Sequence, residues 1–468
     1  MTTVRIFNHH VHSTFYWLAV VDFFLFILAF YLGTYFYFFF EPGSFANYIN
    51  QIPGRALMYA SVTAISLLAM GLYEPRMREG TAGVLLRTGG GFVAATLVMA
   101  SIFYLLPELQ VWRGIYVYTA AVAVTFNLIN RSLFNSLTDL DQFKRRVLIY
   151  GTGRAAATVT SSMRRRADRK GFNIVGFVRV GDEDPLIDNV RIINLRQPLV
   201  EYTRQTEIDQ IVVALDDRRD ALPMEELFEC RLNGVKVSDL VNFFEQEAGK
   251  ILVDFVTTSW MTFADGFRCS ASSKVAKRWS DVAAAFILLM AAWPFMLLTA
   301  LAIWIEDGFR APVFFRQKRV GLHGRHFEVL KFRSMSVNAE GDGKARWATK
   351  DDARITRVGA FIRKTRIDEL PQILNVLAGD MAFIGPRPER PEFVKELAEK
   401  IPYYNARHCV KPGITGWAQL CYPYGASEHD ARQKLQFDLY YVKNHTHFLD
   451  YMIMLNTVEV VLFGKGAR

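Results

Sequence analysis

Four long apolar stretches, separated by short polar segments, fill the N-terminal part of the chain. They run roughly over Phe15–Phe40, Ala56–Leu72, Gly91–Leu106 and Gly114–Ile129. A helix needs about 20 apolar residues to cross the hydrocarbon core, so the shorter stretches would extend into their flanks. The pattern predicts four transmembrane helices arranged as two hairpins.

Basic residues predict the orientation of these helices. Most lie between the second and third stretches or after the fourth, namely Arg76, Arg78, Arg87, Arg131, Lys144, Arg145 and Arg146. Since cytoplasmic loops are enriched in Lys and Arg, the N-terminus and everything after the fourth stretch are expected in the cytoplasm. We interpret Asp22, in the first stretch, as facing the bundle or the interface, with a proton or ion relay as the alternative.

After Phe143, short apolar runs alternate with helical segments. The runs interpreted as strands are Arg146–Tyr150, Phe172–Val178, Val190–Ile193, Ile208–Leu215 and Val235–Ser238, with a helix over Met224–Leu232. This alternation predicts a parallel α/β sheet.

A glycine-rich turn follows the first of these strands. Gly151 and Gly153 resemble the fingerprint in which backbone N–H groups reach a dinucleotide pyrophosphate at a helix N-terminus. Asp168 and Asp182 are weak candidates for the ribose-binding acid. Because the pattern alone is a weak signal, nucleotide binding and a structural or regulatory role both stay open, with the second favoured.

A further apolar segment, Val282–Trp304, is long enough to span the membrane. Basic residues flank it on both sides, which conflicts with a single crossing: Lys274, Lys277, Arg278, Arg310, Arg316, Lys318 and Arg319. Pro294 near its centre removes a helix hydrogen bond. We therefore expect two half-helices that enter and leave by the same face, with a kinked fifth crossing as the alternative.

Composition fits a chain that is part membrane-embedded and part soluble. The 51% of hydrophobic residues and the mean hydropathy of +0.12 are too high for a fully soluble protein, whereas 22% charged residues is too many for one lying wholly in the membrane. The aromatic and aliphatic content excludes disorder. The net charge of +9 favours an anionic partner. Four scattered cysteines argue against disulfides and structural zinc.

The C-terminal part of the chain carries dense polar motifs. In chain order they are Gln317-Lys-Arg319, Lys331-Phe-Arg333-Ser-Met335, Arg363-Lys-Thr-Arg366, Asp368-Glu369-Leu-Pro-Gln372, Gly379-Asp380-Met381, Gly385-Pro-Arg387-Pro-Glu389 and Lys411-Pro-Gly413-Ile-Thr-Gly416-Trp417.

The adjacent carboxylates Asp368 and Glu369 suit phosphoryl chemistry on a magnesium-bound diphosphate. One carboxylate can ligate Mg²⁺ while the other acts as a nucleophile, and nearby arginines can clamp phosphate oxygens. A bare Asp-Glu pair is more often a solvated helix surface, but the rigid proline turns downstream favour a built site. Arg387, between two prolines, either points into that site or lies in a surface turn.

These motifs, in this order over about residues 270–468, resemble the bacterial polyprenyl-phosphate glycosyl-1-phosphate transferases that initiate exopolysaccharide, capsule or O-antigen synthesis. The N-terminal helices and the Rossmann-like middle domain resemble the long subclass of that family. The resemblance implies an α + α/β multidomain membrane protein. Its expected parts are a four-helix transmembrane domain (1–140), a Rossmann-like cytoplasmic domain (141–265), a linker and re-entrant membrane helix kinked at Pro294 (270–310), and a monotopic transferase catalytic domain (311–468).

The resemblance also implies the chemistry. Asp368 would attack the sugar-linked phosphorus of a UDP-sugar and release UMP, undecaprenyl phosphate would then take the phosphosugar, and Glu369 would ligate Mg²⁺. The expected phosphate-binding residues are Arg363, Arg366, Arg387, Lys331 and Arg333, with Asp380 and Glu389 in support. Family frequency alone puts UDP-glucose first as donor and UDP-galactose second.

The expected partners are a UDP-sugar, undecaprenyl phosphate and membrane lipids, without nucleic acid, and with a homodimer as a further expectation. The expected location is the bacterial inner membrane, with the soluble domains in the cytoplasm. Two other function classes stay open: a membrane-tethered nucleotide-sugar oxidoreductase or dehydratase acting through Gly151–Ala156, and a non-catalytic polysaccharide-assembly protein. The sequence contains no Tyr-x-x-x-Lys pair, which argues against the first.

Overall fold

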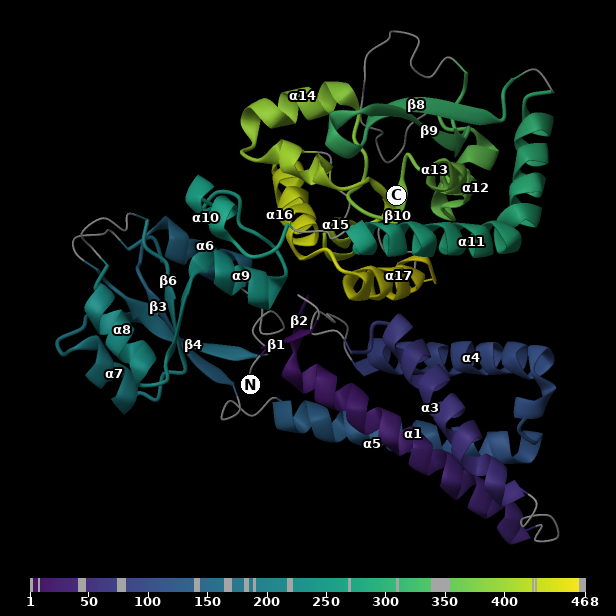
Figure 1. The fold of residues 1–468 in the computed structure, drawn as a ribbon, viewed down its shortest axis with the longest axis horizontal. Helices are drawn as coiled ribbons and strands as arrows, with labels where there is room; N and C mark the ends of the chain where they lie inside the picture. The colour runs from purple at the N-terminus through teal and green to yellow at the C-terminus, as the bar shows by residue number, and fades with distance from the viewer. Residues whose placement is uncertain are drawn as a thin grey trace. The chain divides into compact units, whose positions relative to one another are not determined.

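The computed structural model describes residues 3–6, 9–40, 48–73, 81–138, 144–163, 171–180, 185–187, 191–216, 222–267, 271–308, 311–337, 354–422, 425 and 427–462. The chain divides into two compact units between Ala248 and Gly249, except that a few residues near the N-terminus group with the second unit. The first unit holds a helical bundle and an α/β domain, and the second holds the C-terminal motifs (Figure 1).

Four long helices form the bundle of the first unit. They are α1 (Ser13–Phe40), α3 (Ile52–Ala69), α4 (Thr81–Leu105) and α5 (Arg113–Thr138), each over one of the predicted apolar stretches. Among the described residues, α1, α3 and α4 are long and apolar enough to cross a membrane, as is α11 of the second unit. The helix α5 is less apolar because Asn127, Asn130 and Arg131 lie in its C-terminal half.

Asp22 of α1 is fully buried inside this bundle. Its carboxylate accepts hydrogen bonds from the Tyr73 hydroxyl at 2.9 Å and from the amides of Asn127 and Asn130 at 3.0 and 2.8 Å. A buried carboxylate is tolerated only with such partners. The predicted orientation toward the bundle is confirmed, and Asp22 links α1 to α5.

The α/β domain is built on a five-stranded parallel sheet in the order β5-β4-β3-β6-β7. Its strands are β3 (Arg145–Tyr150), β4 (Phe172–Val178), β5 (Ile192–Ile193), β6 (Gln210–Val213) and β7 (Lys236–Asp239). Its helices are α6 (Arg154–Ser162), α7 (Leu199–Gln205), α8 (Met224–Leu232) and α9 (Leu240–Ala248). The predicted parallel sheet is confirmed, and β3 and β6 are apolar runs because both of their faces are buried.

The second unit combines two small sheets with short helices. An antiparallel hairpin pairs β8 (Phe314–Val320) with β9 (His326–Phe332), and β10 (Ala382–Ile384) pairs in parallel with β11 (Gly413–Thr415). Helices and 3₁₀ turns surround them: α10 (Thr258–Phe263), α11 (Ala271–Glu306), α12 (Arg357–Lys364), η7 (Ile367–Glu369), α13 (Gln372–Ala378), α14 (Pro391–Lys400), η8 (Tyr404–Cys409), α15 (Trp417–Cys421), α16 (Glu428–Asn444) and α17 (His447–Leu462).

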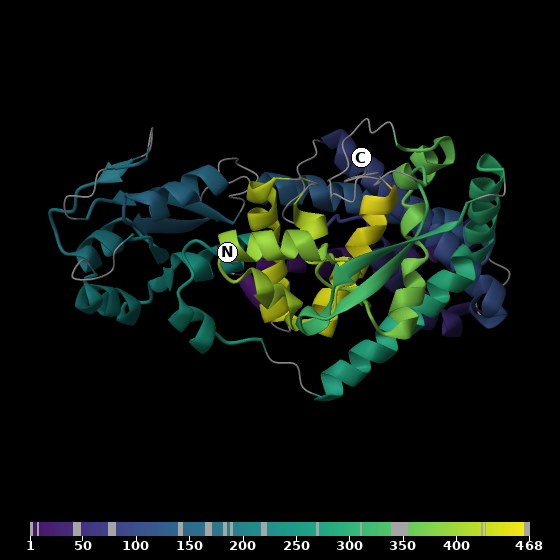
Figure 2. The same cartoon turned by 90° about the horizontal axis from the view of Figure 1, so that it is seen from above.

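The predicted membrane segment lies in α11, a single 36-residue helix with Pro294 inside it. The two expected half-helices thus belong to one continuous helix, and its re-entrant course stays a prediction. The ribbon of α11 nevertheless changes direction part-way along its length in both views (Figures 1 and 2). An internal proline bends a helix in this way because it removes one hydrogen bond and clashes with the preceding turn.

Both ends of α11 are held by the soluble part of the second unit. Near its start, the Arg278 guanidinium donates to the carbonyls of Val376 and Leu377 in α13, at 2.6 and 2.8 Å. At its end, the Glu306 carboxylate accepts from the backbone N–H groups of Arg357 and Val358 in α12, at 2.9 and 3.2 Å. The helix thus leaves and rejoins the same domain.

The division between the units comes earlier than the predicted end of the middle domain at residue 265. Residues 249–267 belong to the second unit, where the Ile251 N–H donates to the Gln436 carbonyl at 2.9 Å and the Trp417 indole donates to the Gly249 carbonyl at 2.8 Å.

Candidate active site

The Asp368-Glu369 pair lies on a short 3₁₀ turn between two helices. Arg366, at the end of α12, adopts a left-handed backbone conformation with φ 61° and starts this turn, and α13 begins soon after it. Ile367 packs against a cluster that contains Ile303 of α11 and Phe332 of β9. Core packing thus anchors the turn and fixes the carboxylates beside β9.

Glu369 is the centre of a cluster of charges. One of its oxygens, Oε1, accepts from the Lys331 ammonium at 3.0 Å and from the Arg387 guanidinium at 2.5 Å. Burial would raise the pKa of Glu369, but the charges of Arg387 and Lys331 hold that pKa well below its ordinary value. Glu369 is therefore a permanent anion at neutral pH.

Asp368 lies next to this cluster but in a different electrostatic state. Its side chain is buried, and among the described residues no hydrogen-bond donor reaches its Oδ1 oxygen. Burial raises the pKa of Asp368, and the neighbouring Glu369 carboxylate raises it further. A carboxylate with a raised pKa and an uncommitted oxygen is a better nucleophile or base than one tied up by donors.

The two adjacent carboxylates thus have their pKa values pushed in opposite directions. Such a split is typical of sites in which two acids do different work. Glu369 is held as an anion by its two cations, whereas Asp368 keeps one oxygen that no donor among the described residues reaches.

The main chain of the Gly-Pro-Arg-Pro segment is fixed by close packing and by hydrogen bonds. Gly413 approaches it so closely that a Cβ on Gly413 would lie 2.1 Å from the Gly385 nitrogen, so the Lys-Pro-Gly motif needs glycine there. Four consecutive carbonyls accept hydrogen bonds: that of Pro386 from the Gly413 N–H, that of Arg387 from Arg407, that of Pro388 from Arg319 and that of Glu389 from the Val320 N–H. Just before the segment, the carbonyl of Ile384 in β10 accepts from the Tyr441 hydroxyl. Of the two readings of Arg387, the contact of its guanidinium with Glu369 Oε1 at 2.5 Å favours the one in which it points toward the carboxylate pair.

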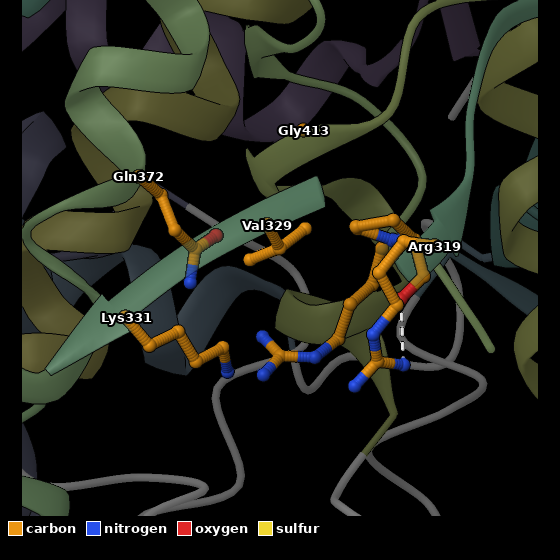
Figure 3. Close-up of a pocket in the computed structure, with 7 residues that line it drawn as sticks. Arg319, Val329, Lys331, Gln372 and Gly413 are labelled. Atoms are coloured by element: carbon orange, nitrogen blue, oxygen red, sulfur yellow. Dashed lines mark hydrogen bonds between the residues drawn. The ribbon is translucent and has the colours of Figure 1, made fainter. Parts of the chain in front are cut away.

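A small pocket opens beside these residues, lined by Arg319, Val329, Lys331, Gln372, Arg387, Pro388 and Gly413 (Figure 3). Arg319 and Lys331 both point toward it in that view, and the dashed line marks the bond from Arg319 to the Pro388 carbonyl, 3.2 Å long. Burial lowers the pKa of the Arg319 guanidinium, and Glu389 at 3.5 Å opposes that shift. The pocket collects positive charge, as a site for a diphosphate requires.

Comparison with known proteins gives two family matches. Residues 272–464 match the bacterial sugar transferase family, and residues 68–222 match a CoA-binding domain. The chain is 30% identical over 444 residues to the UDP-glucose:undecaprenyl-phosphate glucose-1-phosphate transferase of Xanthomonas campestris pv. campestris, covering 90% of each chain. The enzyme of the same name from Escherichia coli K12 is 31% identical over 372 residues, 77% of each chain. The UDP-N-acetylgalactosamine-undecaprenyl-phosphate N-acetylgalactosaminephosphotransferase of Aeromonas hydrophila is 41% identical over 261 residues, 56% of this chain and 60% of that one.

The chain belongs to the bacterial undecaprenyl-phosphate sugar-1-phosphate transferases. The predicted family and the predicted multidomain membrane architecture are thereby confirmed. Family membership favours a transferase over the oxidoreductase and the non-catalytic assembly protein.

The structure of this transferase brings some of the predicted site residues together and leaves others apart. Lys331, Arg387 and the two carboxylates form the cluster described above. Arg366 lies in the turn itself and lowers the pKa of Glu369, although less than Arg387 and Lys331 do. Arg363 is half-buried one turn earlier in α12, and Glu369 is contacted by Lys331 and Arg387.

Three other predicted residues lie outside the cluster. Arg333 is buried and pairs with Asp307 at the end of α11, so its described partner is the membrane helix. Asp380 is exposed beyond the end of α13, and Glu389 contacts Arg319 rather than the carboxylate pair. Their roles toward substrate phosphate stay predictions.

Two site residues had no role in the sequence-based prediction. Arg319 lies in the quoted Gln317-Lys-Arg319 motif, and Gln372 ends the Asp-Glu-Leu-Pro-Gln motif. Gln372 is almost fully buried, and within the described part of the chain its side-chain Nε2 has no acceptor. Their positions in these motifs were the one signal that could have identified them. The sequence does not show that their side chains line the pocket.

The residues at the pair fit a magnesium ion bound together with a substrate. Among the described residues, no group of three or more His, Cys, Asp or Glu could hold a metal alone. Mg²⁺ commonly takes only one or two carboxylates and completes its shell with substrate phosphates and water. The hard oxygens of Asp368 and Glu369, one of them without a donor, match that donor set.

The Gly151–Gly153 turn is filled by the chain's own Asp216. The two Asp216 oxygens accept from the backbone N–H groups of Arg154 and Ala155, each at 2.7 Å, at the start of α6. A Cβ on Gly153 would lie 2.4 Å from Asp216 Oδ2. Asp216 thus takes the position at the helix N-terminus that a phosphate takes in dinucleotide domains. This geometry supports the structural role; Asp168 and Asp182 lie outside the described residues.

Replacing Asp216 with alanine is expected to loosen the start of α6, because two N–H groups lose their acceptor. Loss of such a cap costs about 1 kcal/mol, so exchange of the Arg154 and Ala155 amides should quicken by roughly fivefold. Hydrogen–deuterium exchange of the full chain in detergent measures this, with the exposed Glu201→Ala in α7 as the control. Unchanged exchange in Asp216→Ala would refute the capping role.

Proposed function

We propose that this transferase moves a hexose-1-phosphate from a UDP-sugar to undecaprenyl phosphate in two steps. An Asp368 carboxylate oxygen attacks the phosphorus bonded to the sugar, the bridging P–O bond breaks, and UMP leaves. A phosphate oxygen of undecaprenyl phosphate then attacks the same phosphorus, and the bond to Asp368 breaks. The product is undecaprenyl-diphosphate sugar, and Asp368 is restored.

One observation carries this proposal. The buried Asp368 Oδ1, with no donor among the described residues, lies beside an anion already neutralised by Lys331 and Arg387. Without those cations, an anionic nucleophile would be repelled by the diphosphate it attacks. The Arg319 guanidinium adds a further cation for the same phosphates.

Glu369 is the residue proposed to hold Mg²⁺ together with the donor diphosphate. The two cations contact Oε1, so the metal would be held through Oε2. A bound Mg²⁺ supplies neutralisation of the phosphate charge that develops as UMP leaves. Lys331 and Arg387 keep Glu369 ionised and oriented for that task.

The test is UMP release by the purified protein in detergent. With a UDP-hexose and Mg²⁺ but no lipid acceptor, we expect about one UMP per active site, and turnover only after undecaprenyl phosphate is added. A chelator should stop release. No UMP with any UDP-hexose would overturn the proposal.

The donor sugar is proposed to be a hexose or its N-acetyl derivative. Relatives are named for glucose, galactose and N-acetylgalactosamine. UDP-glucose stays our first choice because a relative named for glucose is 30% identical over 90% of this chain, whereas the relative named for galactose is 28% identical over 76% of it. The same UMP assay, run with UDP-glucose, UDP-galactose and UDP-N-acetylgalactosamine in parallel, decides among them.

We also propose that the protein lies in the bacterial inner membrane and that α11 is re-entrant. The α/β domain and the domain that follows α11 would then both face the cytoplasm. A straight helix would separate Arg278 from Glu306 by about 40 Å, more than the hydrocarbon core of about 30 Å. Yet both residues contact the same domain. Homodimer formation stays a prediction of the family resemblance.

Cysteine labelling tests this topology. In a cysteine-free background, Lys274→Cys and Arg316→Cys, both at exposed positions, should react with an impermeant maleimide in inverted membrane vesicles but not in intact spheroplasts. The matched control is Glu108→Cys, between α4 and α5, which should show the reverse pattern. Labelling of Lys274→Cys and Arg316→Cys from opposite sides would establish a crossing.

A further inference from the structure

A buried ion pair lies behind the Gly-Pro-Arg-Pro loop. The guanidinium of Arg407 in η8 is 2.7 Å from the carboxylate of Asp438 in α16, and the two side chains are only 7% and 2% exposed. Burying two charges costs about as much free energy as their attraction returns, so such a pair contributes little net stability. Its geometry suggests another use.

Arg407 connects Asp438 to the main chain of the site. The same NH2 group that faces Asp438 donates to the Arg387 carbonyl at 2.9 Å, and NH1 donates to the Tyr404 hydroxyl at 2.8 Å. Burial opposes the charge of Arg407, but Asp438 and Tyr404 keep its pKa above the ordinary value. The Arg407 guanidinium therefore stays charged. It contacts the Asp438 carboxylate and also donates to the main chain of the loop.

Arg407 binds the main-chain carbonyl of Arg387, the residue whose side chain reaches Glu369. Arg387 stands between two prolines, whose rings fix φ on either side of it and so narrow the conformations open to the loop. Its guanidinium reaches Glu369 Oε1 at 2.5 Å. A shift of about 1 Å in a group that orients a reaction can cost about 100-fold in rate.

We propose that Arg407 and Asp438 are positioning residues that fix the Arg387 main chain and so aim its guanidinium at Glu369, with neither residue contacting the substrate. This inference deepens the proposed function and rests on it. Lys434 and Glu389 are the other charged groups whose fields act on the Asp438 carboxylate.

A double-mutant cycle tests the inference. Lysine at position 407 keeps the charge but lacks the planar fork that meets Asp438, Tyr404 and the Arg387 carbonyl together. Arg407→Lys should lower kcat for UMP release by ~10–100-fold and change KM for the UDP-sugar by less than about threefold. In an Arg387→Ala background the same change should cost less than about threefold, because the group that it positions is gone.

The matched control is Leu439→Val, next to Asp438 on α16 and fully buried, which should lower the melting temperature without lowering kcat. As a second measurement, amide exchange of a peptide spanning 385–390 should quicken in Arg407→Lys and not in Leu439→Val. Equal losses in both Arg387 backgrounds, or unchanged exchange in that peptide, would overturn the inference. A wild-type protein that releases no UMP would instead remove the proposed function, so the two failures are distinguishable.

Discussion

Asp368→Asn is expected to abolish UMP release, with a loss of at least ~10⁴-fold in the first step, because removal of a covalent nucleophile costs on that order. Asparagine matches the carboxylate in size, so packing around the buried side chain is kept. The amide supplies neither the negative charge nor the oxygen nucleophile. The measurement is single-turnover UMP release with a UDP-hexose and no lipid acceptor.

The control for this change is Asp254→Asn. Asp254 belongs to the same unit and pairs with Arg432 on the surface. Exposed ion pairs contribute about 0–1 kcal/mol, so that variant should keep full activity. Retention of even a tenth of the wild-type rate in Asp368→Asn would mean that another group attacks the phosphorus.

Arg387→Ala is expected to give the second largest loss, about 10²–10³-fold in kcat, the range seen when one preorganised donor to a developing charge is removed. Two effects add in this variant. Glu369 loses the partner at 2.5 Å that does most to keep its pKa low, and the phosphates lose a cation. Arg387→Lys should recover only part of the loss, because lysine has no fork for two oxygens.

Arg316→Ala provides the matched comparison for Arg387→Ala. Arg316 is a strongly exposed arginine in β8 whose contact with Glu328 is 3.7 Å long. Its removal should leave kcat unchanged within about twofold. Equal losses in Arg316→Ala and Arg387→Ala would show that general positive charge, rather than a positioned guanidinium, is what the reaction needs.

Much of the architecture was predictable because its signals are local. Long apolar stretches predicted the four bundle helices. Short apolar runs that alternate with helical segments predicted the parallel sheet of the middle domain. Within the site, the chemistry of Asp368, Glu369 and Arg387 was readable from residue type, whereas Lys331 was expected only from the family resemblance. These residues were found without knowledge of their distances.

The parts that were missed depend on contacts between residues distant in the chain. Arg407 is 20 residues from Arg387 in the sequence, and Asp438 lies in a different helix from Arg407. No local sequence pattern therefore predicts that these three residues are in contact. The same holds for Asp216, which fills the glycine turn from 61 residues or more away. A glycine pattern reports that something approaches the backbone closely, but not whether it is a nucleotide or the chain itself.

The continuity of α11 shows a second limit. Flanking charges and Pro294 predicted a re-entrant segment made of two half-helices, and the structure has one continuous helix over that segment. A proline removes a single backbone hydrogen bond, and the remaining ones keep the two arms in one helix. The contacts of Arg278 and Glu306, rather than hydropathy, carry the argument that both ends lie on one side.

The central claim is that Asp368 carries the phosphosugar between the two substrates. The direct measurement is the mass of the protein after incubation with a UDP-hexose and Mg²⁺ without lipid acceptor, followed by peptide mapping after acid quench. The account predicts an adduct of one phosphohexose on the peptide that contains Asp368, absent in Asp368→Asn and lost when undecaprenyl phosphate is added. An unmodified peptide under conditions in which UMP is released would contradict it.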